Sequence, residues 1–283
     1  MPVTTCIVGF DSAWTDNPKS PGAICALTVA RSGVASFTAP RLATFDQALE
    51  FIRTETTSSD VSIVALDQPT IVPNLTSLRP VDRVAGSLVG YTGGGVQPAN
   101  RSKKNMFGDD APVWRFLDGL GATQDPERSR TANTGLHLLE VFPALSLPAF
   151  DARFNGYRKG PKYNPGNKRT FQISDWHNVL DTVDGYARNT HLGGIEAWAR
   201  GIKRRTTERP PQKADQDMLD SVLCCLIGYH WRIAPRASSI MLGDLESGYM
   251  VAPTEAGTRS RLTAAAAKHG VRVDGRVISA PEA

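Results

Sequence analysis

The feature that most constrains the fold is the run Val61–Leu66, in which Ser62 is the single polar residue. A strand that is apolar on nearly every residue is buried on both faces, as in parallel sheets covered by helices. The run ends at Asp67-Gln68-Pro69, where proline stops the ladder of hydrogen bonds. The chain is therefore expected to fold as an α/β protein around a central sheet.

Other segments supply the remaining elements of that fold. Strands are expected at Thr5–Phe10, Ala23–Ala30, Val34–Phe37 and Leu136–Phe142, with a late pair at Ile240–Leu242 and Gly248–Val251. Helices are expected from Thr44, over Ala111–Leu120, from Lys168 towards Val183, over Gln216–Trp231 with Asp215 as N-cap, and from Thr254 to Ala267. The order predicts a single domain over residues 1–270, a mixed sheet flanked by helices, with a tail at 271–283.

Composition narrows the class of protein. Hydrophobic residues make up 41% and charged residues 21% of the 283, which excludes a disordered chain or a coiled coil. The strongest apolar run, Val222–Ile227, is far shorter than the ~20 residues of a membrane span. The N-terminus lacks the pattern of a signal peptide, and the four cysteines form no C-x-x-C motif, so a cytoplasmic protein with reduced thiols is expected. The net charge of +4 leans mildly towards anionic partners.

Acidic residues occur at or in the expected strands. Asp11 follows the first strand, Asp67 follows the buried one, and Glu140 lies within Leu136–Phe142. In an open α/β sheet, ligands bind beyond the carboxyl ends of the strands. Taken singly, each aspartate is more often a turn former, and Glu140 is equally consistent with an edge strand that faces solvent.

A second acidic pair begins the late apolar helix. Asp217 and Asp220 are three residues apart and share one face, although two acids there also suit the positive end of a helix. Carboxylates gathered from separate elements repel one another unless cations lie between them. Ligand sets made of oxygen suit Mg²⁺ or Mn²⁺, and two such ions can clamp a phosphodiester. We therefore expect two metal ions.

The motifs around these acids resemble a known family. Gly9-Phe10-Asp11, Ala65-Leu66-Asp67-Gln68-Pro69, Leu139-Glu140-Val141-Phe142-Pro143-Ala144 and Asp217-Met218-Leu219-Asp220-Ser221 are similar to the predicted-nuclease family catalogued as domain of unknown function 429. The resemblance runs from about Thr5 to Val251 and implies an RNase H-like fold related to RuvC-type resolvases. It implies that Asp11, Asp67, Asp217 and Asp220 bind the metal, as in the resolvases. Glu140 matches a motif of the unknown-function family but not of the resolvases, and it is expected as a further catalytic residue. Ser221, where alanine is usual, and Ser12-Ala13-Trp14, where glycines are common, depart from the pattern.

Basic residues gather in loop-rich segments. Arg101, Lys103 and Lys104 form one group, and Arg158, Lys162, Lys168 and Arg169 form another, interleaved with Tyr157 and Tyr163, which could stack on bases. A solvated loop is the alternative for each group, but together they favour a polyanionic substrate. These seven basic residues are the expected substrate contacts.

The leading hypothesis is a metal-dependent nuclease that hydrolyses phosphodiester bonds, with water activated at a metal held by Asp11 and Asp67. The alternatives are a non-catalytic nucleic-acid-binding protein on the same fold and a small-molecule phosphotransferase. The last is disfavoured because Ser12-Ala13-Trp14 replaces a Gly- and Thr-rich phosphate loop. The sequence leaves DNA and RNA equally open.

Overall fold

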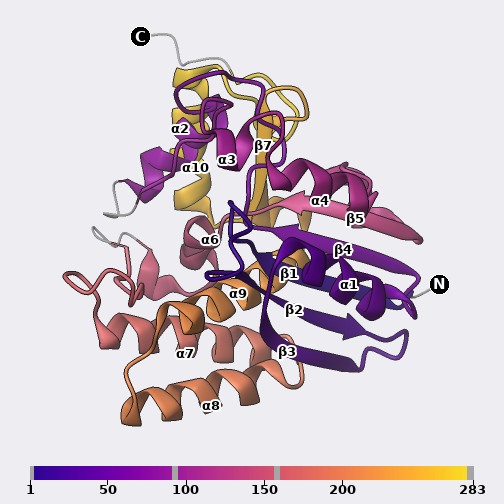
Figure 1. The fold of residues 1–283 in the computed structure, drawn as a ribbon, viewed down its shortest axis with the longest axis vertical. Coiled ribbons are helices and arrows are strands. Elements are labelled where there is room, and N and C mark those ends of the chain that lie inside the picture. Colours follow the sequence, from indigo (N-terminus) through magenta and orange to yellow (C-terminus); the bar gives the residue numbers. More distant parts are fainter. Residues whose placement is uncertain (1–2, 91–94, 156–159, 279–283) are drawn as a thin grey trace.

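A five-stranded mixed sheet forms the centre of the computed structural model, which describes residues 3–90, 95–155 and 160–278 (Figure 1). The strand order is β3-β2-β1-β4-β5. The strands are β1 (Thr5–Asp11), β2 (Gly22–Val29), β3 (Ala35–Ala43), β4 (Val61–Leu66) and β5 (Gly135–Glu140). β1, β4 and β5 run parallel, and β2 is antiparallel to both of its neighbours. The mixed α/β sheet confirms the expected fold class and is consistent with an RNase H-like layout.

Side chains alternate between the two faces of the sheet, as the period of a strand requires. Ile7 of β1 and Ile63 of β4 point into one apolar cluster, while Val8 and Val64 point into the other. The first face is covered by α9 (Lys213–Ile233), with α7 (Ile173–Asn189) and α8 (Ile195–Glu208) beyond it (Figure 1). The second is covered by α1 (Phe45–Thr56) and α4 (Pro112–Leu120). The sheet is thus buried on both faces.

Two glycines let α9 lie directly against the sheet. A side chain at Gly9 of β1 would place its Cβ 2.0 Å from the carbonyl oxygen of Ser221 on α9. At Gly228 of α9, a Cβ would lie 2.9 Å from Ile7 and 3.1 Å from Ala65. The close approach fixes how the start of α9 is set against the end of β1.

A third apolar cluster forms the other end of the molecule. It packs α2 (Pro80–Val89) and α10 (Ala256–His269) with the separate antiparallel pair β6 (Ser239–Asp244) and β7 (Gly248–Pro253). Val271 and Val273, which fall in the expected tail, are buried in this cluster, and Val273 pairs with Leu242. Residues 271–278 therefore pack against β6.

Two helix starts differ from expectation. The helix expected from Lys168 begins at Ile173, because residues 167–171 form a separate turn and the amide of Gln172 donates to the carbonyl of Lys162 (2.7 Å). Asp215 is not an N-cap. Gln212 caps α9, and the Asp215 side chain accepts from its amide at 2.8 Å.

The chain also forms short helices that were not expected. These are α3 (Lys104–Phe107), α5 (Pro126–Thr131), α6 (Pro143–Phe150) and two 3₁₀ turns, Ala152–Phe154 and Arg236–Ser238. The longer helix α8 also lies outside the segments expected to be helical. Within the described parts of the chain, no helix is long and apolar enough to cross a bilayer.

Candidate active site

Asp11 and Asp67 lie side by side at the carboxyl edge of the sheet. β1 and β4 are parallel, with Phe10 opposite Leu66, and the amide of Asp67 donates to the carbonyl of Phe10 at 2.9 Å. Both aspartates are half-buried. Neighbouring parallel strands therefore present the two carboxylates at adjacent positions.

Asp220 comes to the same place from α9. The contact between Gly9 and Ser221 sets this part of the helix against the end of β1. The Asp220 carboxylate is buried and accepts two hydrogen bonds, from the hydroxyl of Tyr163 (2.8 Å) and from Nε2 of Gln216 (2.6 Å). Its orientation is thus fixed by a loop residue and by a residue one helical turn earlier.

The three carboxylates line one cavity of about 460 Å³, together with Lys162, Tyr163, Lys213 and Gln216. Burial, followed by the charges of Asp220 and Asp67, raises the pKa of Asp11 well above its usual value. Burial and the charges of Asp220 and Glu140 do the same to the pKa of Asp67. Burial raises the pKa of Asp220 to about 6. Shifts of this kind are concentrated at functional sites, where like charges are held together.

Lys213, a residue that the sequence did not point to, supplies a positive charge to this cavity. Its ammonium pairs with Asp217, and its charge lowers the pKa values of Asp11, Asp67 and Asp220. Burial opposes the charged form of Lys213, but the hydrogen bond that its ammonium donates to Asp217 and the charge of Asp11 raise its pKa overall. Its position four residues before Asp217 on the helix is the signal that could have identified it.

Asp217 occupies a different position from Asp220. It does not line the cavity, and its side chain accepts from Lys213 on the same helix. Its charge still raises the pKa of Asp11. The structure thus brings together three of the four expected metal ligands in the cavity. The fourth, Asp217, is paired with Lys213 instead.

Glu140 is the anchor of a buried ion network. Its Oε1 accepts from Nη2 of Arg79 at 2.6 Å, and its Oε2 accepts from the amide of Thr70 at 2.9 Å. Arg79 is 1% exposed and also pairs with Asp82 at 2.7 Å. The interpretation of Glu140 as a solvent-facing edge residue is therefore wrong. Its carboxylate holds the segment that follows Asp67, and it lies outside the lining of the acidic cavity.

The donor chemistry of the cavity fits a hard divalent cation. Three carboxylates line it, and the buried Oε1 of Gln216 finds no hydrogen-bond partner in the part of the chain that the structure describes. Oxygen donors of this kind suit Mg²⁺ or Mn²⁺. Within residues 3–90, 95–155 and 160–278, however, no three His, Cys, Asp or Glu side chains are grouped to hold a metal ion. The donors fit in kind and place, without a preformed coordination shell.

Where the structure describes them, the basic residues expected to contact the substrate lie at or next to two separate cavities. Lys162 lines the acidic cavity, and Lys168 and Arg169 are exposed on the following turn. Arg101 and Lys104 line a second cavity of about 1110 Å³, and Lys103 precedes α3. Arg101 pairs there with Asp109 and lies over the ring of Trp114. Arg158 and Tyr157 fall outside the described residues.

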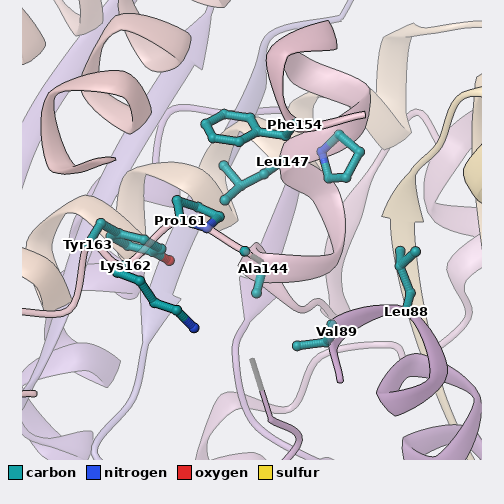
Figure 2. Close-up of a pocket in the computed structure, with 10 residues that line it drawn as sticks. Leu88, Val89, Ala144, Leu147, Phe154, Pro161, Lys162 and Tyr163 are labelled. Atoms are coloured by element: carbon teal, nitrogen blue, oxygen red, sulfur yellow. The ribbon is translucent and has the colours of Figure 1, made fainter. Parts of the chain in front are cut away.

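Tyr163 does not serve as a platform for stacking bases. It is 9% exposed, and its hydroxyl donates to Asp220. The prediction of a stacking role for it is wrong, because its ring belongs to the core cluster beneath α9. Tyr163 also lines a small apolar pocket of about 70 Å³, together with Leu147, Phe154 and Pro161 (Figure 2).

The fold and the site together define an α/β protein with a carboxylate-lined cavity at the edge of its parallel strands. The chain belongs to the family described as "Protein of unknown function (DUF429)", whose model matches residues 9–241. This match confirms the family that the sequence motifs indicated. No curated protein and no solved structure matches the chain.

Proposed function

We propose that the protein is a metal-dependent nuclease that hydrolyses phosphodiester bonds. The observation that carries the proposal is the convergence of Asp11, Asp67 and Asp220, from three separate elements, on one open cavity. Holding three like charges together destabilises the apo protein, so the arrangement is suited to a cationic ligand. A bound Mg²⁺ or Mn²⁺ ion, or a pair of them, would stabilise negative charge and lower the pKa of water.

The chain's own residues have distinct roles in this proposal. Asp11, Asp67 and Asp220 hold the cation, and Tyr163 and Gln216 keep the carboxylate of Asp220 oriented. Asp217 holds the ammonium of Lys213. Lys213 and Lys162, which line the same cavity, face the phosphate of the substrate. Glu140 keeps the chain after Asp67 in place through Thr70.

Nucleic acid is the substrate that the surroundings favour. Lys168 and Arg169 are exposed next to the segment that carries Lys162 into the cavity. Cations in such positions neutralise backbone phosphates and supply most of the non-specific affinity. The four cysteines are free and buried, which suits a reducing compartment, and we place the protein in the cytoplasm.

A cleavage assay tests the proposal. Wild-type protein is incubated with single-stranded, duplex and branched DNA and RNA in Mg²⁺, in Mn²⁺ and in EDTA. Loss of a ligand to the metal removes most of the charge stabilisation, so Asp11→Asn and Asp67→Asn should abolish any cleavage. Asp118→Asn is the matched control, because Asp118 is exposed on α4.

Two outcomes contradict the proposal. Cleavage that persists in Asp67→Asn would assign the activity to another site or to a contaminant. Binding of nucleic acid without cleavage under every condition would instead favour the non-catalytic binding protein.

A further inference from the structure

A smaller cavity of about 150 Å³ adjoins the acidic cavity at Asp67. Asp67, Gly95 and Phe142 line both cavities. A ligand that spans the two would therefore pass the carboxylate of Asp67. The smaller cavity lies well below the ~300–1,000 Å³ of drug-sized pockets, so its volume suits one small ring system.

The walls of this cavity are aromatic and apolar. Trp14, Val96, Phe142 and Met250 line it. The indole of Trp14 is held in place, because its Nε1 donates to the carbonyl of Asp67 (3.1 Å) and its ring packs edge-on against Phe107 at 5.4 Å. A held aromatic ring in an apolar cavity is suited to stacking with a planar ligand.

The charged groups that line the cavity, apart from Asp67, are already paired. The guanidinium of Arg79 is bound by Glu140, by Asp82 and by the carbonyl of Ile71. These groups therefore offer little to a phosphate or a carboxylate. The ligand that fits this part of the site is neutral.

Gln68 provides an unsatisfied polar group in the same wall. It is 0% exposed, and its Oε1 accepts from the hydroxyl of Ser12. Among the described residues its Nε2 has no hydrogen-bond partner, although Gln68 lines the cavity. A buried donor without a partner carries a desolvation cost, which a ligand acceptor would remove.

We propose that this cavity binds a nucleobase, with Gln68 Nε2 donating to a carbonyl oxygen or ring nitrogen on the edge of the base. This inference rests on the proposed function, because it places the base of a nucleotide beside the phosphate that is cleaved. Enzymes that take a base out of its stack read it in this way, by hydrogen bonds to its edge and by stacking on its faces.

Binding is measured by calorimetry with Asp11→Asn protein, so that cleavage is blocked and one of the charges that repel a phosphate is removed from the cavity. The probes are the four nucleoside monophosphates, ribose 5-phosphate, and short single-stranded oligonucleotides with and without one abasic position. Stacking on an aromatic ring is worth ~1–3 kcal/mol per base, so at least one nucleotide should bind about tenfold or more tightly than ribose 5-phosphate. If mononucleotides bind, the cavity accepts the base of a free nucleotide. If only the oligonucleotides differ in affinity, with the abasic one binding more weakly, the cavity accepts a base that is part of a strand.

Two variants locate the site. Gln68→Leu removes the hydrogen-bond donor, and Val96→Trp fills the cavity without changing a carboxylate. Val96→Trp should remove the preference for a base, and Gln68→Leu should reduce it several-fold, because one hydrogen bond is lost while stacking on Trp14 remains. Both variants should leave the affinity for ribose 5-phosphate unchanged. Thermal melting verifies folding, and either variant alone suffices if the other unfolds.

The results separate this inference from the nuclease proposal. Base-dependent binding that both folded variants weaken supports the base site even if no substrate is cleaved. Equal binding of base-bearing and abasic probes overturns the base site even if the protein cleaves nucleic acid. Base-dependent binding that survives in a folded Val96→Trp protein also overturns it, because the base then binds elsewhere.

Discussion

The amide of Asp67 donates a 2.9 Å hydrogen bond to the carbonyl of Phe10, the residue immediately before Asp11. This bond ties the loop after β4 to the last peptide of β1, so the two aspartates cannot separate while the sheet is intact. Gly9 of β1 admits the backbone of Ser221 on the adjoining α9, and Ser221 directly follows Asp220. Three carboxylates are thus held together by backbone contacts in the core of the protein.

The first prediction concerns the pH dependence of stability. Burial raises the pKa of Asp220 from 3.8 to about 6, so protonation of this group favours the folded state. Its contribution to stability is complete below pH 4 and is lost as the pH rises through about 6. Asp220→Asn should therefore match wild type near pH 4 and be more stable above pH 6, by up to about 3 kcal/mol.

Urea unfolding at a series of pH values, without divalent metal, measures this difference. Asparagine can still accept from Tyr163, so the fold should be retained. Asp118→Asn should show no such pH dependence, because Asp118 is exposed. A wild-type protein that is more stable than Asp220→Asn at pH 8 would contradict the account that burial disfavours the charged form of Asp220.

The second prediction is that Glu140→Gln acts in the opposite direction. It removes a charge from the buried pair with Arg79, whose side chains are 1% and 3% exposed. Asp82 still compensates Arg79 in this variant and burial raises the pKa of Glu140, so the loss is that of one charged hydrogen-bonded pair, and the free energy of unfolding should fall by about 1–3 kcal/mol. Glu127→Gln is the control, since Glu127 pairs with Arg236 at the surface and should change stability by less than ~1 kcal/mol. Equal effects of the two variants in denaturant unfolding would show that the buried network is unimportant.

The third prediction concerns Lys213. Its charge lowers the pKa values of the three cavity carboxylates, so Lys213→Met should raise them further. The loss of stability with rising pH should then continue to a higher pH than in wild type and be larger in total. Lys203→Met, which removes a surface pair with Asp181, should leave that pH unchanged. An unchanged profile in Lys213→Met would mean that its ammonium does not act on the carboxylates.

The sequence was sufficient for the parts of the site that depend on strand order. Asp11 and Asp67 follow buried strands, and parallel neighbours place such residues at one edge. Asp220 could be expected from the buried character of its helix. The position of Asp217 was harder to predict, because a spacing of three residues leaves the side chains of Asp217 and Asp220 about 60° apart around the helix. That rotation points one into the cavity and the other towards Lys213.

The remaining contacts join residues whose sequence separation hides them. Arg79 and Glu140 meet across 61 positions, and Tyr163 reaches Asp220 across 57. Tyr163 also lies in a segment without periodicity, where burial leaves no pattern in the sequence. Pairing of this kind is decided by tertiary packing, which local sequence does not encode.

The fourth prediction concerns Lys168 and Arg169, the exposed basic residues that are proposed to contact the nucleic acid. Each phosphate contact that is lost should flatten the dependence of log affinity on log salt, by ~0.9 on duplex or ~0.7 on single strands. Changing Lys168 and Arg169 together to alanine should reduce the slope by about one to two units, with little effect on base preference. The slope is measured over a salt series with Asp11→Asn protein, so that cleavage is blocked. An unchanged slope would remove this turn from the binding surface.

The measurement that tests the central claim most directly is thermal melting with and without Mn²⁺ at pH 7. A cation bound by the folded state alone stabilises it by about 2.7 kcal/mol at a hundredfold excess over Kd. Wild type and Asp118→Asn should therefore melt several degrees higher in Mn²⁺ than in EDTA. Asp67→Asn should melt at the same temperature in both, at or above that of wild type in EDTA. A wild-type melting temperature that ignores Mn²⁺, or an equal rise in Asp67→Asn, would contradict the assignment of this cavity as a cation site.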